Sequence, residues 1–248
     1  MAAFELRVLG GFELYGPAGE PLVVKSRKAA ALIAYLAHQA DRTQSRERIA
    51  RLLWEDRPEA HARASLRQVL LSIRRLVPGT PLIDEPRPDC VALDPRIVSD
   101  VVRLESALAE AEVSGLVEAV RLFRGDFLEG IAIRSEAFET WVMCERQRLR
   151  SLAMKALQAL LEAKQAARPD EQIEIALKAL ALDPAQESAH RTLIRLYAAT
   201  GRRAEALRQY FRCRDTLWRE FAVRPEPATD LLYRSVLGQL ARPARSTA

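Results

Sequence analysis

The sequence predicts an α+β region at residues 1–98, followed by an all-α region at residues 99–248. Three observations support this division. Short runs rich in β-branched and aromatic residues lie before Ser99, and strand signals cease after it. Leu, Ala, Arg and Glu, which favour helix, dominate the composition. A 34-residue period also appears in the second region, at residues 153–186 and 187–220.

The first residues contain three apolar runs separated by glycine-containing turns. The runs are FELRVLG, FELYG and PLVV, and the turns lie at Gly10–Gly11 and at residues 16–19. Short apolar runs between tight turns are typical of a small antiparallel sheet. We therefore expect three short strands at the start of the chain.

Three helices are expected next. Ser26 precedes the periodic segment RKAAALIAYLAHQ and Ser45 precedes RERIARLLW, so each serine is a candidate N-cap. Asp56 and Glu59 form a candidate cap for a third helix over residues 62–77.

A β-hairpin is expected after the helices. Pro78-Gly79 should end the third helix. The runs PLID and CVALD then predict two paired strands, with Arg87 near the tip of the turn that joins them.

The third predicted helix has two incompatible faces. Its apolar residues recur at spacings of three and four and therefore share one side: Leu66, Val69, Leu70, Ile73, Leu76 and Val77. The segment holds four arginines and no acidic residue, whereas ordinary surface helices pair opposite charges. A positive face with an amide and small residues complements the major groove of DNA. An arginine-rich, solvated helix would give the same pattern.

The expected order, β-β-β-α-α-α-β-β, is the layout of a winged helix-turn-helix, in which the third helix enters the major groove. Arginine and glutamine side chains recognise guanine and adenine edges there. We predict base-edge or groove contacts for Arg67, Gln68, Ser72 and Arg75. We predict phosphate contacts for Arg63, Arg74 and Arg87. The alternative for each residue is a solvated side chain.

The second region is expected to consist of helices throughout. Ser99-Asp100 and Ser114 are expected to begin helices, and one long helix is expected at residues 135–167. The 34-residue blocks match the period of tetratricopeptide repeats, whose stacked helix pairs form a surface for a partner. A generic helical bundle is the alternative. We interpret Tyr197, Tyr210 and Phe211 as packing residues.

Composition and motifs exclude several classes of protein. The net charge of +5 and the pI near 9.4 permit nucleic-acid binding without requiring it. Three widely spaced cysteines indicate a reducing cytoplasm. The sequence contains no run of eighteen apolar residues, so we expect no membrane-spanning segment. Neither phosphate-binding loops nor metalloprotease motifs occur, so we expect no enzyme, cofactor or metal site. His38, His61 and His190 are isolated, and we expect them at surface or capping positions.

Seven ordered motifs carry a resemblance that covers nearly the whole chain. Those before residue 98 are KSRKAAALIAYL (25–36), RERIARLLW (46–54) and ARASLRQVLLSIRRL (62–76). Those after it are FRGDFLEG (123–130), FETWVMCERQRLR (138–150), LYAATGRRAEALRQY (196–210) and EFAVRPEPATDLLYRSVL (220–237). Together they resemble the SARP/AfsR-like family of bacterial transcriptional activators. Two departures are the hairpin tip EPRPD, which lacks a glycine, and Leu71 on the polar helix face.

The resemblance implies an OmpR/PhoB-type winged helix at residues 1–98 and a tetratricopeptide-like bacterial transcriptional activation domain at residues 99–248. It implies a cytoplasmic, nucleoid-associated activator. The expected partners are double-stranded promoter DNA, RNA polymerase and a second copy bound to direct repeats.

Two other functions stay open. The winged helix could be a protein-interaction module, which would make the chain a non-DNA-binding adaptor. The chain could also be the N-terminal regulatory part of a longer NTPase or cyclase signalling protein. Residues 241–248, ARPARSTA, look more like a chain terminus than a linker, which favours the activator over this last alternative.

Overall fold

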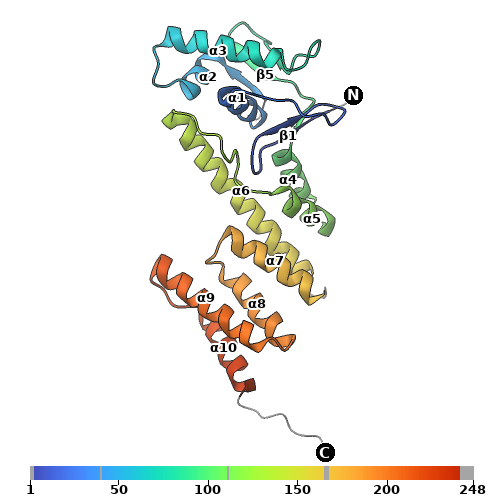
Figure 1. Ribbon diagram of the computed structural model, residues 1–248, viewed down its shortest axis with the longest axis vertical. Coiled ribbons are helices and arrows are strands. Elements are labelled where there is room, and N and C mark those ends of the chain that lie inside the picture. Colours follow the sequence, from blue (N-terminus) through green and yellow to red (C-terminus); the bar gives the residue numbers. More distant parts are fainter. Residues whose placement is uncertain (1–2, 40, 111, 165–167, 241–248) are drawn as a thin grey trace, which may run out of the picture. The chain divides into compact units, whose positions relative to one another are not determined.

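A computed structural model describes residues 3–39, 41–110, 112–164 and 168–240 (Figure 1). The tail at 241–248 and the end of the helix predicted to reach residue 167 lie outside these ranges. The chain divides into two compact units, one ending at Ala153 and the other beginning at Met154. The structure is mostly helical with small sheets.

The N-terminal unit contains two three-stranded sheets and the helices α1 to α5. Its strands are β1 (Phe4–Arg7), β2 (Glu13–Tyr15), β3 (Thr43–Ser45), β4 (Ile83–Asp84), β5 (Cys90–Leu93) and β6 (Ile97–Ser99). Its helices are α1 (Arg27–Ala37), α2 (Arg46–Leu53), α3 (Glu59–Arg74), α4 (Asp100–Ala109) and α5 (Val113–Leu122). Helix α6 (Glu136–Ala163) continues past Ala153.

The first sheet has the order β2-β1-β6, which differs in part from the prediction. β1 and β2 pair antiparallel as expected. The predicted strand at PLVV is wrong: Pro21 forms only an isolated bridge with Tyr15. β6 instead pairs parallel with β1, with Phe4 opposite Ile97. This partner comes from far along the chain, so local periodicity could not reveal it.

Asp100 fastens the beginning of α4 to the end of β1. Its side chain is buried, and its carboxylate oxygens accept hydrogen bonds from the Val8 and Leu9 backbone N–H groups, each at 3.0 Å. Burial raises the pKa of the Asp100 carboxyl, and these donors together with Arg124 oppose that shift. Ser99 caps α4 by accepting from the Val101 N–H at 3.2 Å, which confirms the predicted helix start. These hydrogen bonds therefore attach the start of α4 to the first sheet.

Helices α1 and α2 begin as the sequence predicts. The Ser26 hydroxyl accepts from the Ala29 N–H, and the Ser45 hydroxyl accepts from the Arg48 N–H. The predicted Asp56–Glu59 cap is wrong: Pro58 occupies the N-cap of α3, and no side chain bonds there. A proline at this position already holds a φ suited to the helix start.

The C-terminal unit is a stack of helices. After the end of α6 come α7 (Pro169–Leu182), α8 (Glu187–Ala199), α9 (Arg203–Phe221) and α10 (Pro227–Leu240). The last part of α6 and the whole of α7 lie within the first predicted 34-residue block. Helices α8 and α9 form most of the second block. Its core contains Ala176, Leu193, Ile194, Ala206 and Val236. Small alanines allow helices to approach closely, as repeat packing requires.

Aromatic residues close this core near α10. Tyr197 and Tyr210 belong to the core, which confirms their predicted packing role. The Tyr210 ring stacks on Tyr233 at 4.0 Å between centroids. Phe211 contacts both rings edge-on but stays 38% exposed.

His190 is buried between α8 and its neighbours, so its predicted surface or capping position is wrong. The side chain is 3% exposed. Its Nε2 lies 2.9 Å from the Pro184 carbonyl oxygen and its Nδ1 lies 2.7 Å from Gln209 Nε2. This pattern suits a neutral ring that donates through Nε2 and accepts through Nδ1. Burial lowers the pKa of His190 below its ordinary value.

This lowered pKa predicts acid sensitivity of the C-terminal unit. The unfolded chain binds the His190 proton more readily than the folded chain, so the contribution of a neutral His190 is present above about pH 6.5 and is lost as pH falls. We expect His190→Gln to reduce the loss of unfolding free energy between about pH 7.5 and 5.5 by roughly 1 kcal/mol. Urea denaturation at both pH values measures this difference. His61→Gln, at an exposed position, is the matched control. Equal pH dependence in wild type and His190→Gln would contradict the prediction.

Candidate nucleic-acid interface

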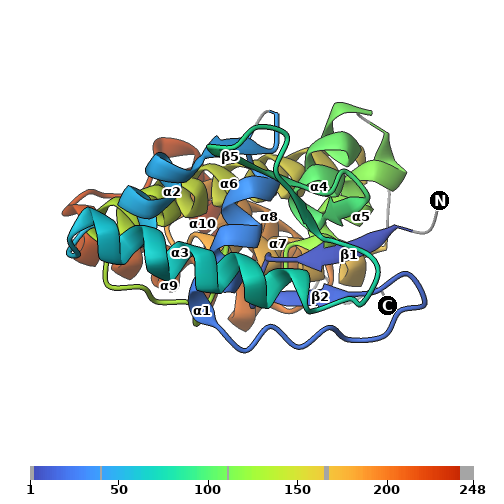
Figure 2. The same cartoon turned by 90° about the horizontal axis from the view of Figure 1, so that it is seen from above.

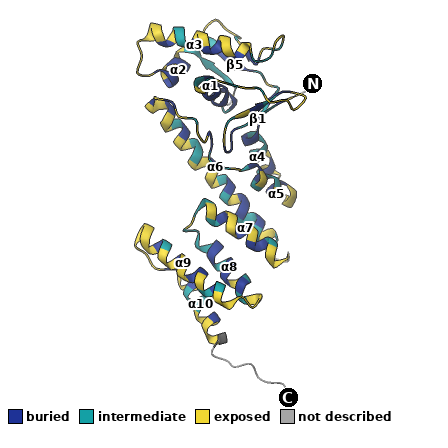
Figure 3. Ribbon diagram, in the orientation of Figure 1, coloured by how far each residue is buried: buried dark blue, intermediate teal, exposed yellow. Residues whose placement is uncertain are grey.

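Helix α3 lies against α1 and α2 and turns its other side outward (Figures 2 and 3). The predicted apolar face is confirmed where it falls within the helix: Leu66, Val69, Leu70 and Ile73 are buried. Leu76 and Val77 follow the helix end and are half-buried. The helix spans Glu59–Arg74, three residues earlier than predicted at each end.

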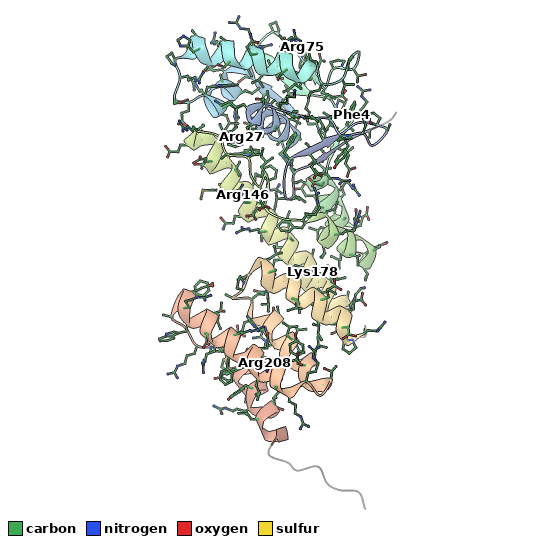
Figure 4. The ribbon with its side chains drawn as sticks, viewed as in Figure 1. Phe4, Arg27, Arg75, Arg146, Lys178 and Arg208 are labelled. Carbon is green, nitrogen blue, oxygen red and sulfur yellow. The ribbon has the colours of Figure 1, made fainter. Side chains whose placement is uncertain are left out.

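All seven predicted contact residues are exposed: Arg63, Arg67, Gln68, Ser72, Arg74, Arg75 and Arg87. Six belong to α3 or its C-cap, where Figure 4 labels Arg75. The seventh, Arg87, lies in the turn between β4 and β5. The structure thus brings two segments that are separate in sequence into one unit, each with its arginines accessible.

Three of these side chains are held by partners. Arg63 forms an ion pair with Glu59 one turn earlier on α3. Arg74 forms an ion pair with Glu85 on the hairpin. The Ser72 hydroxyl donates to the Val69 carbonyl oxygen at 2.7 Å, so its proton is used within the helix. These three residues would have to exchange partners or share them in order to contact DNA.

The other four candidates have no such partner. In the part of the chain that the structure describes, no side-chain hydrogen bond or ion pair involves Arg67, Gln68, Arg75 or Arg87. Leu71 lies on the same face and is 40% exposed. An unpaired, solvated arginine loses no intramolecular ion pair when it meets a phosphate or a guanine edge. These residues therefore form the most available part of the surface.

The predicted hairpin is present and belongs to a sheet with the order β3-β5-β4. β4 and β5 pair antiparallel, with Ile83 opposite Leu93. The third strand, β3, was not predicted; it pairs with β5 through Thr43 and Ala92. β3 has only three residues, TQS, so it offers no apolar alternation to detect.

Glu85 joins the hairpin to both helices of the candidate interface. Its carboxylate accepts from Arg46, which begins α2, at 2.7 Å, and also from Arg74, near the end of α3. Burial alone would raise the pKa of Glu85, but the hydrogen bonds and charges of Arg46 and Arg74 hold it below its usual value. The Arg46 N–H also donates to the Asp89 carbonyl oxygen at 2.7 Å. Both ends of the hairpin turn are therefore attached to the helices, a link that sequence reasoning did not anticipate.

An open cleft of about 730 Å³ separates the N-terminal half of α3 from the hairpin tip. Arginines and acidic residues both line it, among them Arg46, Arg63, Arg67, Glu59 and Asp89. Its mixed charge distinguishes it from the outer face of α3, where Gln68, Arg75 and Leu71 are exposed. In the described ranges, no group of three or more His, Cys, Asp or Glu residues could hold a metal ion.

Residues 96–237 match the family described as the bacterial transcriptional activator domain, and the chain belongs to this family. It is a SARP-type bacterial transcriptional activator, as the resemblance implied. The chain is 26% identical over 258 residues to the transcriptional regulatory protein MoaR1 of Mycobacterium bovis (strain BCG / Pasteur 1173P2), covering 96% of this chain and 80% of MoaR1. Identity to MoaR1 of Mycobacterium tuberculosis (strain ATCC 25618 / H37Rv) is 25% over the same shares.

A solved structure has the same fold. It is Mycobacterium tuberculosis EmbR in complex with a low-affinity phosphopeptide, which matches with a TM-score of 0.71 and 22% sequence identity. The match covers 96% of this chain and 65% of the EmbR chain. Among the described helices of the present chain, none combines the length and apolar character needed to cross a lipid bilayer.

Proposed function

We propose that this activator binds promoter DNA sequence-specifically through an OmpR/PhoB-type winged helix-turn-helix at residues 1–98. In this proposal α3 lies in the major groove and the β4–β5 hairpin is the wing. The tetratricopeptide-like residues 99–248 form the activation domain, which contacts RNA polymerase. Two copies bind adjacent direct repeats.

The main support for the proposal is the set of exposed, unpaired polar side chains on the outer face of α3. Arg67, Gln68 and Arg75 are exposed, lie opposite a buried apolar face and have no side-chain partner among the described residues. Arginine can bond guanine N7 and O6 in pairs, and glutamine can do the same with adenine N6 and N7. We assign base-edge contacts to these three residues, and a weaker groove contact to Ser72 because its proton is used by Val69.

Phosphate contacts are assigned to three arginines: Arg63, Arg74 and Arg87. Glu59 and Glu85 neutralise the first two in the free protein. A phosphate would compete with these carboxylates, so Arg63 and Arg74 should contribute less than Arg87. Contacts of this kind position the protein on the duplex without reading its sequence.

Selection of binding sites from random double-stranded DNA by the full chain tests the proposal. We expect enrichment of a motif arranged as a direct repeat, and activation of transcription from a promoter carrying it in a reconstituted polymerase assay. Sedimentation with one or two repeats measures how many copies bind. A chain that enriches no sequence, and whose weak DNA affinity is unaffected by salt, would favour a protein-interaction role for the winged helix.

Arg87 on the hairpin provides a separate prediction. Arg87→Ala should lower affinity nearly equally for selected and random DNA, because it removes one phosphate contact. The slope of log affinity against log salt concentration should fall by about one unit. Arg121→Ala removes the same charge from α5 in the same unit, together with its ion pair to Glu118, and controls for the change in net charge. An unchanged slope in a salt titration of Arg87→Ala would place this residue off the DNA.

A further inference from the structure

One face of α9 exposes large apolar side chains that are not part of the hydrophobic core. Trp218 is 62% exposed and Phe221 is 61% exposed. Phe211 lies one helical heptad before Trp218 on the same side of α9, and Val223, 47% exposed, follows the helix end. We define the α9 surface as Phe211, Arg214, Trp218, Phe221, Val223 and Arg224.

The opposite face of α9 already supplies the contacts that hold the helix. Ala206, Gln209, Tyr210, Cys213 and Leu217 are its buried residues. The rings of Trp218 and Phe221 are exposed to water, although aromatic rings of this size are stabilised by burial in a core or an interface. Trp is also among the residues most enriched where binding energy concentrates. The exposed rings therefore indicate a binding surface.

The chain path shapes a cleft at this surface. Ala222 adopts a left-handed conformation, with φ at 55°, and ends α9 so that Val223 and the residues after it turn back beside Trp218. The resulting cleft has a volume of about 470 Å³, and its lining includes Tyr210, Pro225 and Asp230. The Tyr210 hydroxyl donates to Asp230 at 2.7 Å, which holds the aromatic wall in place.

Charged residues of both signs line the cleft: Arg214, Arg224, Asp215 and Asp230. The whole segment 202–224 has a positive excess, with seven arginines and three acidic residues. Arg214 is paired with Asp215. Arg212 and Arg224 form no ion pair with any residue that the structure describes. Because Arg212 and Arg224 lack partners, an occupant with carboxylates beside an apolar side chain would complement this surface best.

We propose that the α9 surface binds an acidic amphipathic segment of a partner protein. An aromatic or aliphatic side chain of that segment enters the cleft against Trp218, and flanking carboxylates pair with Arg214 and Arg224. A second copy of the same surface is disfavoured because it offers no excess of carboxylates to pair with Arg212 and Arg224. DNA is disfavoured because its phosphate backbone offers nothing apolar to cover Trp218 and Phe221.

A direct test uses the full chain and a fluorescent 18-residue helical peptide with Leu and Phe on one face and Glu on the other. Anisotropy should show binding that weakens with added salt. Trp218→Ala should weaken it about tenfold or more, in the range of interface hot spots. Arg214→Glu with Arg224→Glu should weaken it further at low salt. Leu177→Ala, which removes a 47% exposed apolar side chain from α7, should change nothing.

The controls separate this surface from the proposed DNA-binding function. A peptide of the same sequence with Lys for Glu should not bind, and neither should a scrambled acidic peptide. The proposal is overturned if the acidic peptide fails to bind, if the Lys peptide binds equally, or if Trp218→Ala leaves binding unchanged. It is also overturned if the chain associates with itself through Trp218 or if DNA alone occupies the surface. No DNA is needed to detect peptide binding, so a negative result leaves the role of α3 unaffected.

Discussion

Replacing both Arg67 and Arg75 with alanine is expected to abolish recognition of the selected DNA site. Each substitution should weaken specific binding by about 1–3 kcal/mol and relax discrimination at one base pair. The two residues lie about two turns apart on α3, so their losses should be nearly additive and specific affinity should approach the affinity for random DNA. Fluorescence anisotropy with the selected site, its single-base variants and random DNA measures all three quantities.

Folding should not change in these variants. Both side chains are exposed and have no side-chain partner in the described chain, so their removal creates no cavity and leaves no buried group unpaired. Arg121→Ala again controls for the loss of one positive charge. If Arg67→Ala and Arg75→Ala weaken binding to specific and random DNA equally, both residues hold phosphates and base recognition lies elsewhere, with Gln68 as the next candidate.

A fragment ending at Ala153 is expected to fold and bind the selected DNA without activating transcription, whereas a fragment ending at residue 98 should be largely unfolded. The longer fragment is the complete N-terminal unit. The shorter one cuts β6 before Ser99 and removes Asp100, which accepts from the Val8 and Leu9 N–H groups.

The shorter fragment also lacks aromatic packing. Phe127 is 0% exposed and contacts His38 edge-on, with 5.0 Å between ring centroids. Trp141 contacts both Phe127 and Tyr35 edge-on. Loss of a buried aromatic side chain costs about 3–5 kcal/mol, and a domain has only about 5–15 kcal/mol of total stability. Residues 1–98 therefore depend on α4–α6 for much of their core.

Circular dichroism and thermal unfolding establish which fragment folds, and anisotropy and reconstituted transcription follow on the folded one. Activation by the 1–153 fragment at the level of the full chain would contradict the assignment of activation to the C-terminal helices. A folded 1–153 fragment that fails to bind DNA would mean that residues 154–248 supply contacts or pair two copies.

Local patterns in the sequence determined much of the architecture. Ser26 and Ser45 are N-caps as predicted, and Ser99 caps the helix that was predicted to begin there, because a cap depends on one hydroxyl and the next few backbone N–H groups. The buried face of α3 followed from apolar spacing. The β4–β5 hairpin followed from two apolar runs around a turn. Ordered motifs over nearly the whole chain indicated the activator family, and the family match at residues 96–237 confirmed it.

Features that depend on residues far apart in the chain are visible only in the folded protein. β6 replaces PLVV in the first sheet because the free edge of β1 can pair with any extended segment that the fold brings to it. Glu85 binds Arg46 and Arg74, so the arginines at the candidate interface differ in availability although their sequence context is similar. Neighbouring helices cover His190 and leave Trp218 exposed. Pairing, charge neutralisation and burial all depend on which distant residues meet, and a pattern of nearest neighbours does not contain that information.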